Sequence, residues 1–254
     1  MHALNMSDRQ GRVPRLYVDA ELHPDSNVVL PEDAAHHAVR VLRLRDGDAA
    51  ILFDGRGGEY EACLSLRGRG QVAARTGQRR DPERESPLQV TLVQAVSSSE
   101  KMDFTIQKAV ELGVAAIQPL LSEKSVVRLS AGREEKKLAR WRRVAIAACE
   151  QCGRNRLPEL REAMSVETYC RTRDPTTLRL LLSPEGTQGL RDLRDKIERA
   201  VTLAVGPEAG FSDAEERLLQ RAGFVAVRLG PRVLRTETAA LAALAALNAI
   251  AGDF

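Results

Sequence analysis

The stretch that decides the fold class is Leu229-Gly-Pro-Arg-Val-Leu-Arg-Thr-Glu-Thr-Ala239, a polar turn between two apolar segments. The run 225–229 before it is typical of a strand, and the Ala/Leu-rich run after it is typical of a helix. A second turn of this kind, Gly206-Pro-Glu-Ala-Gly210, follows the strand-like run 201–205. Two such turns at the ends of neighbouring strands predict a small-molecule site in an α/β domain. The alternative is a structural loop in which Arg235 pairs with a carboxylate.

Strand-like and helix-like runs alternate from residue 88 to the end of the chain. Strands are predicted over 88–96, 115–121, 178–182, 201–205 and 225–229, and helices over 103–112, 134–151, 212–222 and 238–252. Gly113 is expected just beyond the end of the first helix, and Ser212-x-x-Glu215 is a capping box at the start of the third. Alternation of this kind predicts a parallel sheet flanked by helices.

The last helix is rich in alanine and leucine. We expect Leu241, Leu244, Leu247 and Ala251 to form its buried stripe. Because the remaining positions are mostly alanine, another helix or a partner subunit could pack closely against it.

Residues 13–80 have the pattern of a small β-rich module with one helix. Strands are predicted over 15–18, 49–53 and 60–66, and a helix over 31–42. The module has several arginines and no lysine, and the planar guanidinium suits phosphate contacts. Residues 1–80 hold 12 basic and 11 acidic side chains, so ion pairs within the module are the alternative. The charged stretch 78–87 contains two prolines and predicts a linker.

The composition is that of an ordinary globular protein. The 254 residues are 43% hydrophobic and 29% charged, enough for one large domain or two modest ones. Residues 120–161 hold 11 basic and 5 acidic side chains, which suits a polyanionic partner or a solvated basic helix face. No apolar run is long enough to span a bilayer, and Met1–Gly11 has no apolar core of a signal peptide. A cytoplasmic location is therefore expected.

Several familiar chemistries have no sequence signature here. The chain has no phosphate-binding P-loop, no G-x-G-x-x-G after its first strand, and no G-x-S-x-G nucleophile turn. Cys149 and Cys152 form a lone C-x-x-C without a second pair or a nearby histidine, so we expect buried helical thiols and no metal site. His36 and His37 are expected to have surface or packing roles.

The two turns together resemble the carboxy-terminal signature of the SPOUT methyltransferases. More narrowly, they are similar to the RsmE family, which methylates N3 of a uridine in bacterial small-subunit (16S) ribosomal RNA. Segments 12–15, 36–43, 102–113 and 145–156 also resemble family motifs, so the resemblance covers 12–254. Two departures stand out. Ala209 replaces a usual glycine, and Ser98 and Ser99 stand where the family tends to have a basic residue and a glycine.

The resemblance implies a fold and a cofactor. The expected fold is α/β: residues 1–80 form a PUA-like RNA-binding β-barrel domain, 81–87 a linker, and 88–254 a SPOUT domain with a deep trefoil knot. It also implies a homodimer that uses S-adenosylmethionine. The residues expected to bind this cofactor are Leu182, Gly206, Pro207, Glu208, Gly210, Leu229, Gly230, Leu234 and Thr236.

Uridine N3 carries a proton and is a poor nucleophile until that proton is lost. A guanidinium near the uracil carbonyls would stabilise the developing anion, and Arg235 is the candidate. Glu237 is a candidate proton acceptor or orienting group, with a helix-terminus charge as the alternative. The expected RNA contacts are Arg15, Arg40, Arg43 and Arg154, and the expected partner is small-subunit ribosomal RNA or the 30S subunit. The rival interpretations are a SPOUT enzyme acting on another nucleotide and a non-catalytic RNA-binding module.

Overall fold

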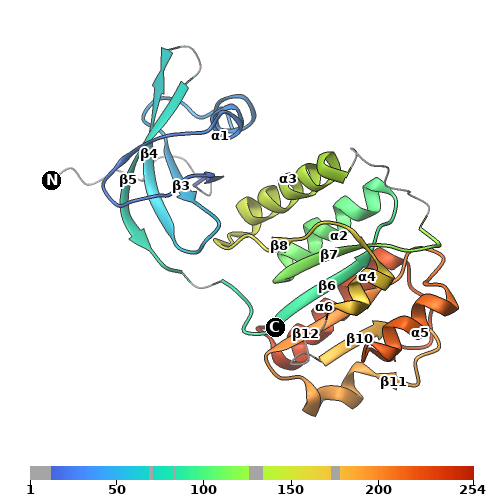
Figure 1. The fold of residues 1–254 in the computed structure, drawn as a ribbon. Coiled ribbons are helices and arrows are strands. Elements are labelled where there is room, and N and C mark those ends of the chain that lie inside the picture. The colour runs from blue at the N-terminus through green and yellow to red at the C-terminus, as the bar shows by residue number, and fades with distance from the viewer. Residues whose placement is uncertain (1–12, 69–70, 83, 126–133, 173–177) are drawn as a thin grey trace. The chain divides into compact units, whose positions relative to one another are not determined.

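The computed structural model describes residues 13–68, 71–82, 84–125, 134–172 and 178–254. The chain forms two compact units (Figure 1). The first contains the chain up to Arg84 together with Cys149–Leu157, and the second contains Glu85–Ala148 and Pro158–Phe254. The expectation for Met1–Gly11 and the motif residue Arg12 lie outside the described residues.

The first unit contains a five-stranded sheet in the order β1-β3-β4-β5-β2. Its strands are β1 (Arg15–Tyr17), β2 (Asn27–Val29), β3 (Ala49–Phe53), β4 (Glu59–Arg67) and β5 (Gln71–Arg80). The β1–β3 pair is parallel and the other pairs are antiparallel. The prediction that 78–80 belong to a linker is wrong, because these residues are the end of β5, and Arg79 and Arg80 pair with Tyr60 and Glu59 of β4. Backbone hydrogen bonds hold them there, and such bonds need no apolar side chains.

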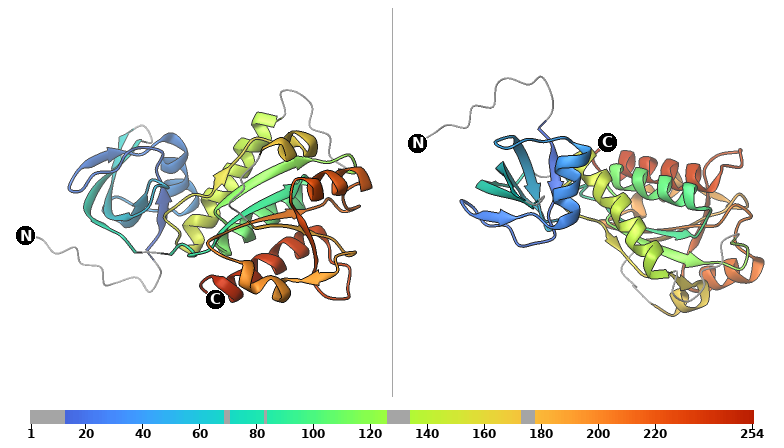
Figure 2. Two further views of the ribbon diagram at one scale, coloured as in Figure 1. Left: turned by 60° about the horizontal axis from the view of Figure 1, so that its bottom comes forward. Right: turned by 90° about the horizontal axis from the view of Figure 1, so that it is seen from above.

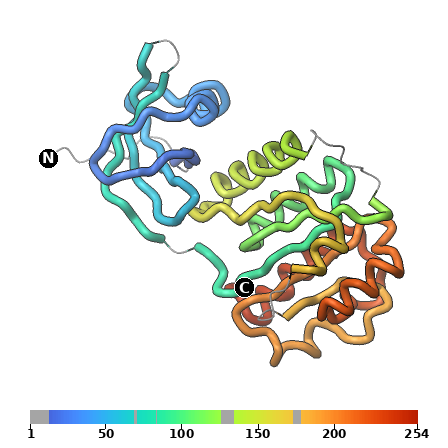
Figure 3. Tube along the Cα trace, in the orientation of Figure 1, coloured from blue at the N-terminus to red at the C-terminus, as the bar shows by residue number. Residues whose placement is uncertain are grey.

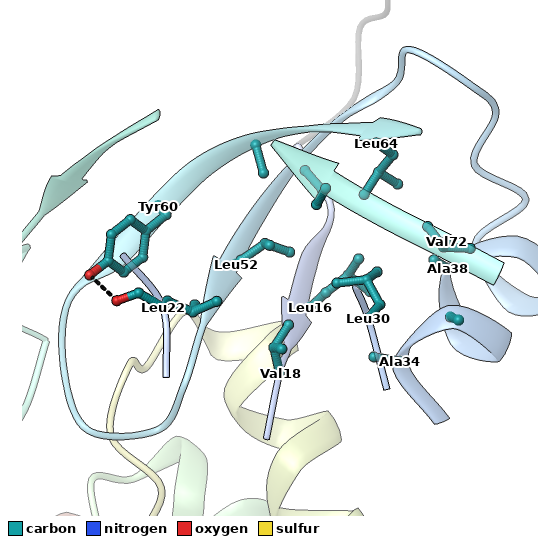
Figure 4. Packing of buried hydrophobic residues seen from close by; sticks show 14 residues of the cluster. Leu16, Val18, Leu22, Leu30, Ala34, Ala38, Leu52, Tyr60, Leu64 and Val72 are labelled. Carbon is teal, nitrogen blue, oxygen red and sulfur yellow. Dashed lines mark hydrogen bonds between the residues drawn. The ribbon is translucent and has the colours of Figure 1, made fainter. Parts of the chain in front are cut away.

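The core of the first unit follows from alternation along its strands. In β4, Tyr60, Ala62 and Leu64 are buried, while the residues between them are more exposed. Figure 4 shows Tyr60 and Leu64 gathering with Leu16 and Leu52, and the Tyr60 hydroxyl donates to the Leu22 carbonyl oxygen at 2.9 Å. The unit is therefore built around a continuous apolar core.

The helix predicted over 31–42 is an α-helix in its first part and a π-helix in its second part. An α-helix, α1 (Glu32–His36), continues as a π-helix, η1 (His37–Val41). Arg43 follows with a φ of 56°, in the left-handed region that few residues other than glycine adopt. The simple 3.6-residue pattern did not indicate this widening of the helix.

The second unit contains an eight-stranded sheet whose pairs are all parallel. The order is β11-β13-β10-β12-β6-β7-β8, and β9 also pairs with β7. The strands are β6 (Gln89–Ala95), β7 (Ala116–Leu121), β8 (Glu159–Leu160), β9 (Met164–Ser165), β10 (Leu178–Leu182), β11 (Gln188–Gly189), β12 (Ala200–Val205) and β13 (Val225–Arg228). All five predicted strands and their parallel arrangement are confirmed. The two-residue strands were too short to give a pattern.

Helices cover both faces of this sheet (Figure 2). They are α2 (Ser99–Glu111), α3 (Glu134–Cys152), α4 (Val166–Arg171), the 3-10 helix η3 (Leu190–Lys196), α5 (Asp213–Arg221) and α6 (Thr236–Ala251). In β6, Val93 and Ala95 pack in one cluster with residues of α4 and α5, whereas Gln94 contacts α6. Successive strand residues point to opposite faces, so β6 contributes to both layers.

Two predicted helix-end signals in the second unit are confirmed, although α2 begins at Ser99 and not at residue 103 as predicted. Gly113 has a φ of 78° just beyond α2. Ser212 and Glu215 form the capping box of α5. Figure 3 follows the chain from β12 through α5 and β13 into α6.

The stripe predicted for the last helix is partly wrong. Leu244 and Leu247 are buried as expected, but Leu241 and Ala251 are only half-buried. Ala240 and Ala243 are buried in their place. Small side chains occupy the buried positions because α6 lies close against α2 and the sheet.

Candidate active site

A pocket lies at the carboxyl ends of three neighbouring strands in the second unit. The parallel register pairs Leu182 of β10 with Val205 of β12 and with Val227 of β13, so the three strands end level. The loops that follow them meet around one cavity. All nine predicted cofactor residues line it: Leu182, Gly206, Pro207, Glu208, Gly210, Leu229, Gly230, Leu234 and Thr236.

The loop after β12 folds back tightly on itself. A Cβ atom at Gly206 would lie 3.0 Å from the Phe211 nitrogen and 3.1 Å from the Gly210 Cα, so only glycine fits without moving the loop. Gly210 has a φ of 71°. Ala209 is not among the described residues with positive φ, so alanine costs no backbone strain at this position.

Thr236 joins the two loops that the sequence singled out. Its hydroxyl donates to the Gly206 carbonyl oxygen at 2.6 Å and accepts from Gln94 Nε2 at 3.0 Å. Thr236 is only 6% exposed. Hydrogen bonds to buried partners fix the relative position of the loops, because leaving these groups unpaired is costly. Gln94 was not predicted from the sequence, since it lies within an apolar strand far from both loops in the chain.

We expect Thr236→Val to lower the free energy of unfolding of the second unit by about 2 kcal/mol. Valine keeps the shape of threonine but leaves the Gly206 carbonyl without the Thr236 donor, and Gln94 Nε2 keeps only its hydrogen bond to the Ala95 carbonyl oxygen. Urea denaturation of the purified variant measures the loss. Thr238→Val is the matched control, because Thr238 is exposed on the same helix. Equal stability of the two variants would contradict the role of the Thr236 hydroxyl.

Arg235 and Glu237 lie at the start of α6, beside the pocket-lining Thr236. Arg235 is the N-cap residue, its side chain makes no capping hydrogen bond, and it is exposed. Within the described part of the chain no salt bridge involves Arg235, so the alternative of a structural ion pair gains no support. Glu237 Oε2 is buried and has no hydrogen-bond partner among the described residues. Neither side chain belongs to the pocket lining.

Glu208 connects the pocket loop to α2. Its carboxylate accepts a hydrogen bond from Lys101 Nζ at 3.0 Å. Burial alone would raise the pKa of Glu208, but hydrogen bonds from its own backbone, from Lys101 and from the Ser98 backbone lower it overall. The carboxylate therefore contacts α2 and positions the loop. Lys101 was not predicted as a site residue, although it lies beside the motif that begins at Met102.

In the first unit, Arg15 lies in a buried polar network. Its guanidinium donates to Glu59 Oε2 at 2.5 Å and to the Asn155 side chain, and it lies 4.9 Å from the centre of the Phe53 ring. Arg15 is 6% exposed and Arg154 is 4% exposed. Because Arg15 is buried and already pairs with Glu59 and Asn155, and Arg154 is buried as well, we withdraw both arginines as direct RNA contacts.

Arg40 and Arg43 are exposed, on η1 and immediately after it. They remain candidates for RNA contacts. Their backbone, with its π-helical turn and left-handed residue, has the kind of irregularity that often occurs at functional positions.

The segment Cys149–Leu157 is held within the first unit by a glycine-rich turn. Gly57 N–H donates to the Asn155 carbonyl oxygen at 3.2 Å, and Leu157 N–H donates to the Gly55 carbonyl oxygen at 3.0 Å. A Cβ at Gly57 would lie 2.8 Å from the Arg156 guanidinium, and its φ is 108°. Glycine therefore permits this close approach. The resemblance marked 145–156 as a motif, but it did not mark this turn or indicate that the two segments touch.

Glu150 of α3 is largely buried within the first unit. Its Oε1 accepts from the Tyr17 backbone N–H at 3.0 Å, and its Oε2 lies 3.6 Å from His37 Nε2. Burial raises the pKa of Glu150 above its ordinary value of 4.5, and this effect outweighs the lowering by Tyr17, His37 and Arg15. The folded state therefore binds a proton more readily than the unfolded state.

We expect Glu150→Gln to remove a pH dependence of stability. A raised pKa contributes stability that is complete below the unfolded pKa and is lost as pH rises through the folded pKa. Glutamine keeps an acceptor for Tyr17 N–H and does not titrate. The stability of the variant relative to the wild type should therefore rise between about pH 5 and about pH 8. Denaturation at both pH values measures this, and a constant difference would contradict it.

The described residues contain neither a metal-binding cluster nor a helix that could span a membrane. No group of three or more histidine, cysteine, aspartate or glutamate side chains there could hold a metal ion. Cys149 and Cys152 both lie in α3 and neither is in a disulfide; Cys149 is buried and Cys152 half-buried. Within the same ranges, the helices are too short or too polar to cross a membrane.

Family models match both parts of the chain. Residues 84–248 match an RNA methyltransferase domain, and residues 30–76 match an RNA methyltransferase PUA domain. Ribosomal RNA small subunit methyltransferase E of Buchnera aphidicola is 32% identical over 243 residues, with 96% of each chain covered.

Solved structures agree with these matches. A Legionella pneumophila protein with its cofactor SAM bound has a TM-score of 0.91 at 40% identity, covering 96% of this chain and all of that one. Ribosomal RNA small subunit methyltransferase E of Neisseria gonorrhoeae, bound to S-adenosylmethionine, has a TM-score of 0.88 at 40% identity and the same coverage.

The two matched parts of the chain are thus those of an RNA methyltransferase with a PUA domain. Within that class, the chain belongs to the family of ribosomal RNA small subunit methyltransferase E.

Proposed function

We propose that this protein transfers the methyl group of S-adenosylmethionine to N3 of a uridine in small-subunit ribosomal RNA. The observation that carries the proposal is the pocket at the level ends of β10, β12 and β13, lined by all nine predicted cofactor residues. Family membership supports it, because relatives that cover nearly the whole chain carry the name of an rRNA methyltransferase and are solved with this cofactor.

The pocket residues suit this cofactor in shape and chemistry. Gly206 leaves room for the tight turn of its loop, and Leu182, Leu229 and Leu234 offer apolar surface. Small-molecule sites commonly combine apolar walls with a few backbone polar groups. When bound, S-adenosylmethionine supplies an activated methyl group, so no metal is required. The protein aligns the acceptor nitrogen with that methyl, which lowers the entropic part of the barrier.

In this proposal Arg235 and Glu237 act on the uracil. The exposed Arg235 guanidinium stabilises negative charge on the uracil carbonyls as the N3 proton leaves. The unpartnered Oε2 of Glu237 is an acceptor available to that proton or to the Arg235 side chain. Both groups adjoin Thr236, whose hydrogen bonds fix the start of α6.

The remaining architecture is proposed from the family resemblance. We assign residues 1–80 to a PUA-like barrel, 81–87 to a linker and 88–254 to a SPOUT domain with a trefoil knot, with the Cys149–Leu157 segment of that range packed in the first unit. We propose a homodimer, supported by the alanine-rich α6, and a cytoplasmic location, where ribosomal RNA is methylated. Arg40 and Arg43 are the proposed RNA phosphate contacts.

The test is methylation of small-subunit rRNA by the purified protein. Both free rRNA and 30S subunits that lack the modification are incubated with labelled donor, and the product is mapped by mass. We expect one methyl group on a uridine base, and a reverse-transcription stop there, because N3 methylation blocks Watson–Crick pairing. A methyl on a ribose would indicate a SPOUT enzyme for another target. Cofactor binding without transfer to either substrate would indicate an RNA-binding module.

A further inference from the structure

A second pocket in the second unit lies between the start of α2 and the start of α3. Its lining includes Ser97, Ser99 and Asp103 from the first segment and Lys136 and Trp141 from the second. None of these residues lines the proposed cofactor pocket.

Two buried polar atoms in this pocket have no partner among the described residues. Ser97 is 2% exposed, and its Oγ makes no hydrogen bond. Asp103 Oδ1 is also buried without a partner, although Oδ2 of the same carboxylate accepts from Arg140 Nε at 2.9 Å. Buried polar groups in proteins are nearly always hydrogen-bonded, so two orphans in one cavity point to a ligand that supplies the missing partners.

The charges around the pocket favour an anionic ligand. Lys136 is exposed at the start of α3, and no salt bridge among the described residues involves it. The 13-residue helix α2 begins here, and the side chain of its N-cap residue Ser98 makes no capping hydrogen bond. A helix N-terminus carries partial positive charge and uncapped amide groups that bind phosphates. Arg140 adds less positive charge to the pocket, because its guanidinium already pairs with the Asp103 carboxylate.

The first turn of α2 connects this pocket to the cofactor site. Ser99 and Asp103 are four positions apart and share one face of the helix, whereas Lys101 projects from the opposite side. Lys101 pairs with Glu208 of the cofactor loop at 3.0 Å. The first turn of α2 therefore contacts both pockets. Ser99 and Asp103 line the second pocket, and Lys101 pairs with the loop of the proposed cofactor pocket.

We propose that this pocket holds one backbone unit of the RNA substrate. A phosphate contacts Lys136, the N-terminus of α2 and the Ser97 hydroxyl, and the ribose 2′-hydroxyl donates to Asp103 Oδ1. An RNA backbone supplies both an anionic acceptor and a neutral donor, which matches the two kinds of orphan group. Trp141 lines the pocket and gives it an apolar wall. The 2′-hydroxyl contact would let the enzyme distinguish RNA from DNA. The inference rests on the proposed function, because it assumes an RNA substrate.

The experiment measures binding of two labelled oligonucleotides by fluorescence anisotropy with the full chain. One is RNA carrying the sequence around the methylated uridine, and the other is its 2′-deoxy counterpart. We expect the wild type to bind the RNA about tenfold more tightly, as for a hydrogen bond to a charged group. Asp103→Asn keeps an oxygen for Arg140 but replaces the free acceptor by a donor. It should reduce the preference to about twofold or less.

Lys136→Ala and Ser97→Ala should weaken both oligonucleotides alike, by about fivefold and threefold, because the phosphate is common to RNA and DNA. Lys196→Ala removes the same charge from an exposed position outside the pocket and is the matched control. Calorimetry with S-adenosylmethionine should give the same cofactor affinity for all variants, which also shows that they are folded.

Either of two results overturns the inference. In the first, the Asp103→Asn variant still binds RNA about tenfold more tightly than DNA. In the second, the Lys136→Ala and Ser97→Ala variants bind RNA as tightly as the Lys196→Ala control. Either result with a wild type that methylates rRNA leaves the proposed function intact. A wild type that methylates no rRNA would instead defeat the proposed function itself.

Discussion

Replacing Arg235 with alanine is expected to lower kcat for rRNA methylation by about 10²–10³-fold, the usual effect of removing one group that stabilises an oxyanion. The side chain is exposed beside the cofactor pocket and has no competing salt bridge among the described residues. It is therefore free to contact the uracil. Because it does not line the pocket, the affinity for S-adenosylmethionine should change by no more than about twofold.

Single-turnover methylation and calorimetry separate these two effects. Arg221→Ala, which removes an exposed arginine at the end of α5, is the matched control and should behave as wild type. Arg235→Lys keeps the charge but loses the planar fork, so it should recover only part of the rate. A variant that loses cofactor affinity and keeps its rate at saturating donor would assign Arg235 to binding instead of catalysis.

Replacing Arg15 with alanine is expected to destabilise the first unit by about 3 kcal/mol, as when one member of a buried ion pair is removed. The change leaves Glu59 with Arg84 as its remaining partner at 3.0 Å, and it leaves the Asn155 oxygen without its donor. Burial would raise the pKa of Glu59, but hydrogen bonds from Arg84 and Arg15 lower it overall. Part of that lowering should disappear in the variant.

Hydrogen exchange locates the effect of this substitution within the chain. Protection should fall in β1, in β3 and in Cys149–Leu157, while the second unit stays protected. Arg67→Ala, at an exposed position of β4, is the control for loss of an arginine.

The double variant Arg40→Ala, Arg43→Ala should instead leave hydrogen-exchange protection unchanged and weaken RNA binding. Its RNA affinity should also depend less on salt concentration than that of the wild type. Normal protection with weak RNA binding in Arg15→Ala would restore Arg15 as an RNA contact.

The apolar strands were the most predictable part of the fold. β3 and β10 match their predicted ranges to the residue, because each is a short apolar run bounded by turn residues. β5 and the two-residue strands were missed, since backbone pairing rather than apolar side chains defines them. The π-helical turn of η1 was missed for a similar reason: helical periodicity does not indicate which hydrogen-bond spacing the backbone adopts.

The candidate site was predictable where it is local in sequence. The two glycine–proline turns directly follow strands, so their meeting at one edge of a parallel sheet follows from the alternating pattern. The partners that fix them were not predictable. Gln94 and Lys101 reach Thr236 and Glu208 across more than a hundred residues of chain, and only the packed sheet brings them together.

The sequence by itself determined the parallel sheet, the family and the pocket loops, because periodicity and short motifs encode local geometry. Only the tertiary structure decided which charged groups are buried. Arg15 and Arg154 read as candidate phosphate contacts in the sequence, yet both are buried in a unit that Cys149–Leu157 joins from far along the chain. Solvent exposure depends on contacts between distant segments. A residue's type shows which interactions it can make, and the fold decides which partners it meets.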